Sequence, residues 1–119
     1  MPIAITLTQI QENNDSVSII GTLAFSGAYT TGGDTLDFTT IAGNATSNGR
    51  IFTPAGLPVS CQINGSAGYS FGFVAGTALN NSKVKVLSSS ATEVSASTYS
   101  TNISGDTNIY IEAQFPKLL

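Results

Sequence analysis

The side chains that could carry chemistry in this sequence are few and far apart. The 119 residues include no histidine, one cysteine and seven acidic residues. Most enzyme mechanisms at neutral pH need an acid, a base or an activated nucleophile held close to a second reactive group. Here the reactive types are scattered among serine, threonine, asparagine and glycine. We therefore expect no catalytic residues and no enzymatic activity.

Asp34 and Asp37 are the carboxylates that most invite a metal-binding interpretation. Calcium takes about six to eight oxygen ligands, usually with several carboxylates from one loop. Leu36 and Phe38 instead indicate that a strand has begun in this segment. Asp34 would then lie in a turn and Asp37 would face solvent. We predict no bound metal and no cofactor.

Cys61 is the one cysteine of the chain, so it has no partner for an intrachain disulfide. It alternates with Val59 and Ile63, and this spacing predicts that it is buried like a small hydrophobic residue. A catalytic cysteine needs a cationic neighbour that lowers the pKa of its thiol. Residues 58–63 contain no such neighbour.

The chain carries little charge of either sign. Charged residues make up 9% of the sequence, and the formal net charge is -3. Nucleic-acid binding needs clustered lysine and arginine. The closest pair of basic residues is Lys83 and Lys85, and their alternation with Val84 places them on the solvent-exposed face of a predicted strand. No stretch approaches the roughly 20 apolar residues that span a bilayer, and no secretion signal is recognisable. We expect neither a nucleic-acid partner nor a membrane segment.

Apolar residues recur at every second position along most of the sequence, which is the period of a strand with one buried face. β-branched and aromatic residues fill most of these positions, and turn-forming residues separate the runs. Strands are predicted over residues 3–8, 17–25, 36–38, 59–63, 68–74, 83–86 and 108–115. Such a pattern suits a sandwich, a jelly roll or a small barrel. We predict one all-β domain over residues 1–119, a β-sandwich or jelly roll of about seven to eight short antiparallel strands.

The same alternation predicts which side chains form the core. The aromatic stripe of Tyr69, Phe71 and Phe73 has strand spacing, so we interpret it as core rather than as an exposed stacking platform. The full predicted core comprises Ile5, Leu7, Ile19, Leu23, Phe25, Phe38, Phe71, Phe73, Val84, Ile109 and Ile111.

Few side chains stand out as candidates for contact with a partner. Tyr110 alternates with Ile109 and Ile111, so it should face away from the core, and an outward aromatic residue is a suitable interface anchor. A surface poor in charge costs little to desolvate, which suits a subunit that buries much of its exterior. We predict a homo-oligomer, with these candidate interface residues: Ile3, Ile5, Tyr29, Tyr110 and Phe115.

One long stretch, IGTLAFSGAYTTGGDTLD at residues 20–37, resembles the front half of small head decoration, or minor structural, proteins of tailed bacteriophages. The resemblance continues through GYSF at 68–71, KVKV at 83–86 and NIYIEAQF at 108–115. It implies a non-enzymatic all-β protein, often trimeric, that binds the lattice of the major capsid protein and cements neighbouring capsomers. It also implies a virion location after synthesis in the host cytoplasm. Residues 41–58 are richer in asparagine, glycine and proline than the resemblance leads one to expect.

Two other functions fit the residues. A tail, fibre or baseplate component of the same virion would share the charge-poor β-scaffold. A carbohydrate-binding β-sandwich module would use Tyr29, Tyr110 or the stripe at 69–73 to stack on sugar rings. Copy number in the virion would separate the first alternative from a decoration protein, and a glycan array would identify the second.

Overall fold

Antiparallel strands dominate the residues that the computed structural model describes, which are 3–12, 15–41, 51–52, 54, 56–65 and 68–116. The all-β class predicted from the sequence is confirmed, and the strands account for more than a third of the chain. Two short helical segments lie between them. The strands in this part of the chain are β1 (Ile3–Glu12), β2 (Ser16–Phe25), β3 (Asp34–Leu36), β4 (Ser60–Asn64), β5 (Ser70–Val74), β6 (Ser82–Leu87) and β7 (Tyr110–Pro116), and the helical segments are η1 (Phe38–Thr40) and α1 (Thr101–Ser104).

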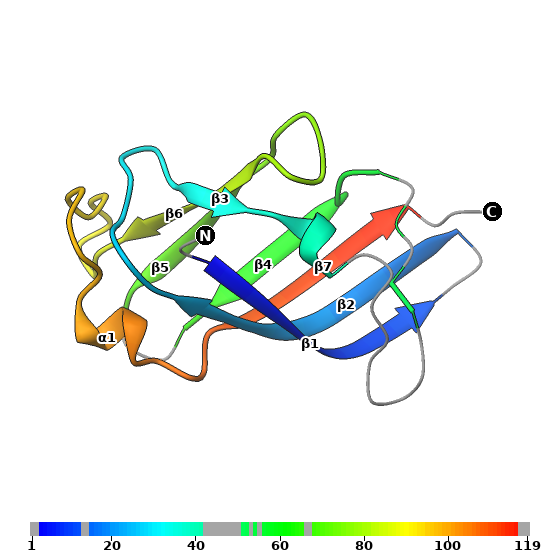
Figure 1. Cartoon of the computed structure of the whole chain (residues 1–119), viewed down its shortest axis with the longest axis horizontal. Coiled ribbons are helices and arrows are strands. Elements are labelled where there is room, and N and C mark those ends of the chain that lie inside the picture. Colours follow the sequence, from blue (N-terminus) through cyan, green and yellow to red (C-terminus); the bar gives the residue numbers. More distant parts are fainter. Residues whose placement is uncertain are drawn as a thin grey trace.

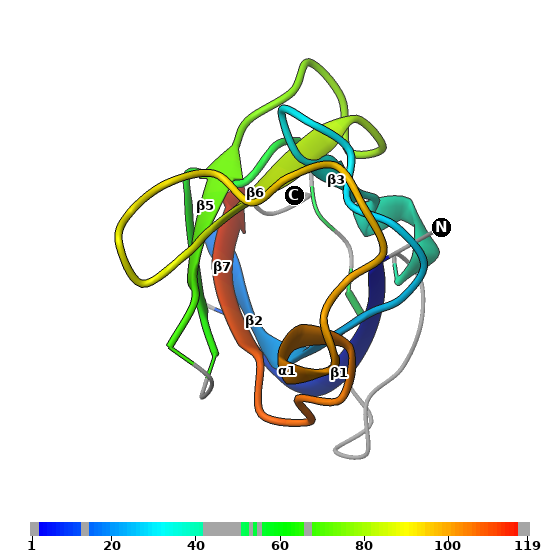
Figure 2. The ribbon, with the colours of Figure 1, turned by 90° about the vertical axis from the view of Figure 1, so that its left-hand side faces the viewer.

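These seven strands belong to one sheet, in the order β1-β2-β7-β4-β5-β6-β3. β7 is the last strand in sequence, yet it lies between β2 and β4 and pairs with both. The sheet curls so that its strands surround a ring, with β1 and β3 at its two edges (Figures 1 and 2). The architecture is therefore one continuous curled sheet rather than two packed sheets, because β7 joins the two halves by hydrogen bonds.

Alternation of buried and exposed side chains sets the inner and outer faces of this sheet, as a strand period of two requires. The pattern is clearest in β7, where every second residue is buried. In β7 the inward positions are Ile111, Ala113 and Phe115, and the outward positions are Tyr110, Glu112 and Gln114.

Gly21 lets β1 and β2 lie close together at the middle of both strands. A Cβ atom at Gly21 would lie 2.3 Å from the carbonyl oxygen of Thr6. The register between the two strands shifts directly beyond this point, between Leu7 and Gln9. A side chain at position 21 would therefore force the strands apart, which explains a glycine inside an otherwise β-branched run.

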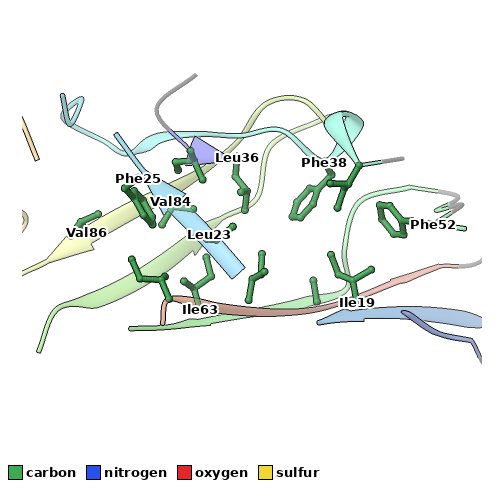
Figure 3. Packing of buried hydrophobic residues seen from close by; sticks show 14 of the residues in the cluster. Ile19, Leu23, Phe25, Leu36, Phe38, Phe52, Ile63, Val84 and Val86 are labelled. Atoms are coloured by element: carbon green, nitrogen blue, oxygen red, sulfur yellow. The ribbon is translucent and has the colours of Figure 1, made fainter. Parts of the chain in front are cut away.

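Aromatic rings fill the space inside the curl. Phe115 on β7 meets Phe38 at a ring-centroid distance of 5.0 Å and Phe52 at 4.8 Å, both edge-on. Phe38 also contacts Phe73, at 6.2 Å. These residues come from segments far apart in sequence, and Figure 3 shows Phe38 and Phe52 close together at one end of the packed cluster. The rings thus connect opposite walls of the sheet.

Most of the predicted core is confirmed. Ile5, Leu7, Phe71 and Phe73 are only partly buried, although they pack against the core. The other predicted members are buried: Ile19, Leu23, Phe25, Phe38, Val84, Ile109 and Ile111.

We expect Phe38→Ala to lower the free energy of unfolding by about 3–5 kcal/mol, because truncating a fully buried aromatic ring leaves a cavity. Phe38 is 0% exposed. Chemical denaturation followed by circular dichroism measures the change. Val74→Ala is the control: Val74 is 40% exposed, so its truncation should change the free energy by no more than about 0.5 kcal/mol. A loss below about 1 kcal/mol for Phe38→Ala would contradict the packing described here.

Candidate functional site on the outer face of the sheet

The five candidate interface residues lie in different environments. Tyr110 is 53% exposed on the outer face of β7, as predicted. Ile5 faces inward and is partly buried. Ile3, Tyr29 and Phe115 are buried within the chain, at 4%, 2% and 0% exposure. Their side chains are therefore unavailable to a partner, contrary to the prediction, because each packs into the core.

A polar surface surrounds Tyr110 on the outer face of β7 and β4. Tyr110 and Glu112 are paired across the strands with Asn64 and Gln62, and Gln114 is paired with Ser60. All are exposed, and Glu112 is the one charged residue among them. We call this surface the Tyr110 face, and its residues are Ser60, Gln62, Asn64, Tyr110, Glu112 and Gln114.

A groove of about 110 Å³ lies on the Tyr110 face beside Glu112. Hydroxyl, amide and carboxylate side chains line it, so it is rich in hydrogen-bond acceptors. The amide nitrogen of Gln114 donates to Ser16 Oγ at 3.2 Å, which leaves Gln114 Oε1 as an acceptor. The groove is lined by Ser18, Ser60, Gln62, Glu112, Ala113 and Gln114.

The outer face of β1 and β2 differs from the Tyr110 face because none of its outward side chains is charged. The two strands are ten residues long each, and their paired outward residues are uncharged: Ile20 is apolar, and the others are small or carry neutral polar groups. We call this surface the neutral face. It consists of Ala4, Thr6, Gln9, Gln11, Ser18, Ile20, Thr22 and Ala24.

The outer face of β5 and β6 carries the two cations found in the described part of the chain, Lys83 and Lys85. Lys83 is paired with Val74 and Lys85 with Gly72. Both lysines are exposed, as predicted from their alternation with Val84. We call Val74, Lys83 and Lys85 the lysine face.

A cluster of tyrosine and carboxylate side chains holds together the loops at the end of the sheet where α1 lies (Figure 1). The hydroxyl of Tyr29 donates to Glu93 Oε2 at 2.5 Å, and the backbone N–H of Gly32 donates to the same oxygen at 2.7 Å. The backbone N–H of Val86 donates to the Tyr29 hydroxyl at 3.4 Å. Glu93 thus ties the turn after Tyr29 to the loop that follows β6.

Tyr99 and Asp34 form a second hydrogen-bonded pair in this cluster, in which the carboxylate of Asp34 is buried. The hydroxyl of Tyr99 donates to Asp34 Oδ2, and the N–H of Thr30 donates to Asp34 Oδ1 at 3.3 Å. The ring of Tyr99 packs edge-on against Tyr29 and Phe25, at 5.9 and 5.4 Å. Asp34 is 4% exposed. It is therefore a buried hydrogen-bond acceptor, rather than the turn residue that the sequence predicted.

Backbone hydrogen bonds reinforce the same loop contact. The N–H of Tyr29 donates to the carbonyl of Ser97 at 2.8 Å, and the N–H of Tyr99 donates to the carbonyl of Gly27 at 3.0 Å. Between them, Ala28 and Thr98 form an isolated antiparallel bridge. The two loops are therefore held by both backbone and side chains.

A cavity of about 120 Å³ lies beside this cluster. Its walls combine aromatic rings with serine and threonine hydroxyls, and the Tyr69 hydroxyl lies 3.5 Å from Ser100 Oγ. The lining residues are Tyr29, Tyr69, Val94, Ser95, Ser97, Thr98, Tyr99, Ser100 and Ile103. Strand periodicity indicates neither Tyr99 nor Glu93, because both lie outside the strands. Tyr29 and Tyr69 are the members of this region that the sequence indicates as possible sugar-stacking residues.

Burial and hydrogen bonding shift the pKa values of these groups. Burial raises the pKa of Tyr29 to about 12, and the bond to Glu93 adds to the effect. The same two causes raise the pKa of Tyr99, with Asp34 as its partner. The hydrogen bonds from Tyr29 and Gly32 lower the pKa of the Glu93 carboxyl. Protonated tyrosines and an ionised Glu93 are therefore the forms that the fold stabilises.

The remaining reactive side chains do not converge. Asp37 accepts a hydrogen bond from the backbone N–H of Thr39 at 2.9 Å and caps η1. Cys61 is half-buried, and burial raises the pKa of its thiol to about 12. Among the described residues, no group of three or more histidine, cysteine or acidic side chains is placed to hold a metal ion.

In comparisons with known proteins, no protein-family profile, curated protein or solved structure matches this chain. Within the described residues, no helix has the length and apolar character needed to cross a membrane.

We expect the stability of the protein to fall as the pH rises from about 10 to about 12, the ordinary and folded pKa values of Tyr29. The folded state holds the hydroxyl proton of Tyr29 more tightly than the unfolded state does. The stabilisation from this group is therefore complete below the unfolded pKa and is lost as the pH rises through the folded pKa. Denaturation at a series of pH values measures the slope. Tyr29→Phe lacks the titrating hydroxyl and should show a shallower decline in this window. An equal decline in both proteins would contradict the account.

Proposed function

We propose that this protein is a non-enzymatic structural protein of a bacteriophage virion, which decorates the outer surface of the head by binding the major capsid protein. The observation that carries the proposal is the neutral face. Its eight outward side chains on two long strands include no charge. Such a surface loses little hydration energy on contact, and charged residues are depleted at the centres of protein interfaces. The resemblance at residues 20–37 supplies the class of target.

Decoration of this kind works by binding energy alone. A protein that binds the assembled lattice but not separated capsomers stabilises the assembled state by mass action. Attachment of several linked copies would add avidity without stronger individual contacts. The described residues fit this role, since Glu93 and Asp34 accept hydrogen bonds in the loops and no three histidine, cysteine or acidic side chains among these residues are grouped to hold a metal ion.

The double variant Gln9→Glu and Gln11→Glu tests the neutral face, because it adds two charges with almost no change of shape. Burying unpaired charges in an interface is costly, so we expect binding to undecorated capsids to weaken about tenfold or more. Co-sedimentation with capsids measures it. Asn80→Asp and Asn102→Asp form the matched control, with two charges added at exposed positions elsewhere. The control should bind like the unmodified protein.

Two results would contradict the proposal. If the unmodified protein does not bind capsids, or binds without raising the temperature at which they disrupt, the decoration function fails. If the glutamate variant binds as tightly as the control, the neutral face is not the docking surface.

The tyrosine-lined cavity favours a second candidate function, the binding of a small sugar. Aromatic rings and hydroxyl groups together suit a sugar ring, which presents both apolar and hydroxyl surfaces. A glycan array would detect such binding, and Tyr69→Ala should abolish it because Tyr69 is a partly buried wall of the cavity. Absence of any sugar ligand would remove this candidate.

A further inference from the structure

The groove on the Tyr110 face has the chemistry of a site for an ammonium group. An ammonium group donates three hydrogen bonds and accepts none. The groove supplies acceptor oxygens from two serines, two glutamines and the carboxylate of Glu112, and none of its lining residues is positively charged. Hydrogen bonds that include an ionised partner are about twice as strong as neutral ones. Glu112 with its neutral neighbours therefore favours a lysine side chain over an uncharged donor.

The chain itself presents such lysines on another part of the same sheet. Lys83 and Lys85 project from β6, next to Val74, which is 40% exposed. The Tyr110 face has a matching apolar element, since the ring of Tyr110 is 53% exposed beside Glu112. The two surfaces thus complement each other in charge and each adds an exposed apolar side chain.

β6 and β7 are not neighbours in the sheet, because β4 and β5 lie between them. One molecule therefore has no means of bringing its own lysine face onto its own groove. We propose that copies of this chain associate head to tail, with Lys83 and Lys85 of one copy entering the groove beside Glu112 of the next. A contact between two different surfaces of identical chains forms a ring when its rotation closes.

Glu93 of the same chain competes for Lys85, which helps to lower the pKa of the Glu93 carboxyl. Oε2 of Glu93 already accepts hydrogen bonds from Tyr29 and Gly32. Glu112 is less committed than Glu93, since it lies on the open outer face. The intermolecular contact therefore does not require the tyrosine cluster to open. Copies of the purified protein should form this contact without a capsid target.

Charge reversal tests the contact in the purified protein by sedimentation at low salt over a range of concentrations. The unmodified protein should associate, and E112K and the double variant K83E/K85E should each raise the dissociation constant about tenfold or more. Mixing the two variants restores opposite charges across both kinds of contact, so the mixture should associate again. D15K is the matched control, because it makes the same charge change at an exposed turn and should associate like the unmodified protein.

Circular dichroism of each variant confirms that it is folded before its association is measured. The proposal is overturned if the unmodified protein stays monomeric at every concentration, or if either reversed variant associates as strongly as the unmodified protein. It is also overturned if the mixture of folded variants fails to associate, or if D15K weakens association as much as E112K. Loss in both reversed variants, recovery in the mixture and no effect of D15K would establish the contact.

Discussion

The described part of the chain holds no second sheet that could pack on the inner face of this seven-stranded sheet, so the sheet curls until its own strands cover that face. The aromatic rings show how this works. Phe38 follows β3 at one edge of the sheet, whereas Phe115 belongs to β7, an interior strand, and the two rings meet at 5.0 Å inside the curl. Burial of apolar side chains, these rings among them, is the dominant favourable term in folding. One consequence is that outward side chains of the described strands, such as Tyr110 and Glu112, remain exposed.

A curled sheet also needs its ends covered, and the tyrosine cluster does this at the end near α1. The ring of Tyr99 packs against the rings of Phe25 and Tyr29. The hydroxyl of Tyr29 donates a hydrogen bond to Glu93, and the hydroxyl of Tyr99 donates one to Asp34. A buried carboxylate is costly unless it is hydrogen-bonded. The loops after β2 and β6 are therefore held together by these hydrogen bonds, with Glu93 and Asp34 as the acceptors.

Local sequence pattern predicts the strands and most of the core, because alternation reports which side of a strand is buried. It also implies the burial of Phe115, which shares a face with Ile109 and Ile111. Phe115 is 0% exposed, so its side chain belongs to the core and not to the predicted interface. Alternation cannot predict that β7 lies between β2 and β4, since pairing of distant strands depends on the whole fold. Nor can it predict that Asp34 is buried, because its partner Tyr99 is 65 residues away.

The three outer surfaces differ in charge in a way that suits separate tasks. The neutral face suits a broad contact with a lattice, whereas the Tyr110 face and the lysine face suit contact between copies. Linked copies would then bind the lattice with avidity.

A cryo-electron microscopy reconstruction of the virion tests the central claim of lattice binding most directly. It should show this fold at repeated positions over the outer head surface, with β1 and β2 toward the capsid. Density for the fold confined to the tail, fibres or baseplate, or lacking throughout the particle, would contradict it.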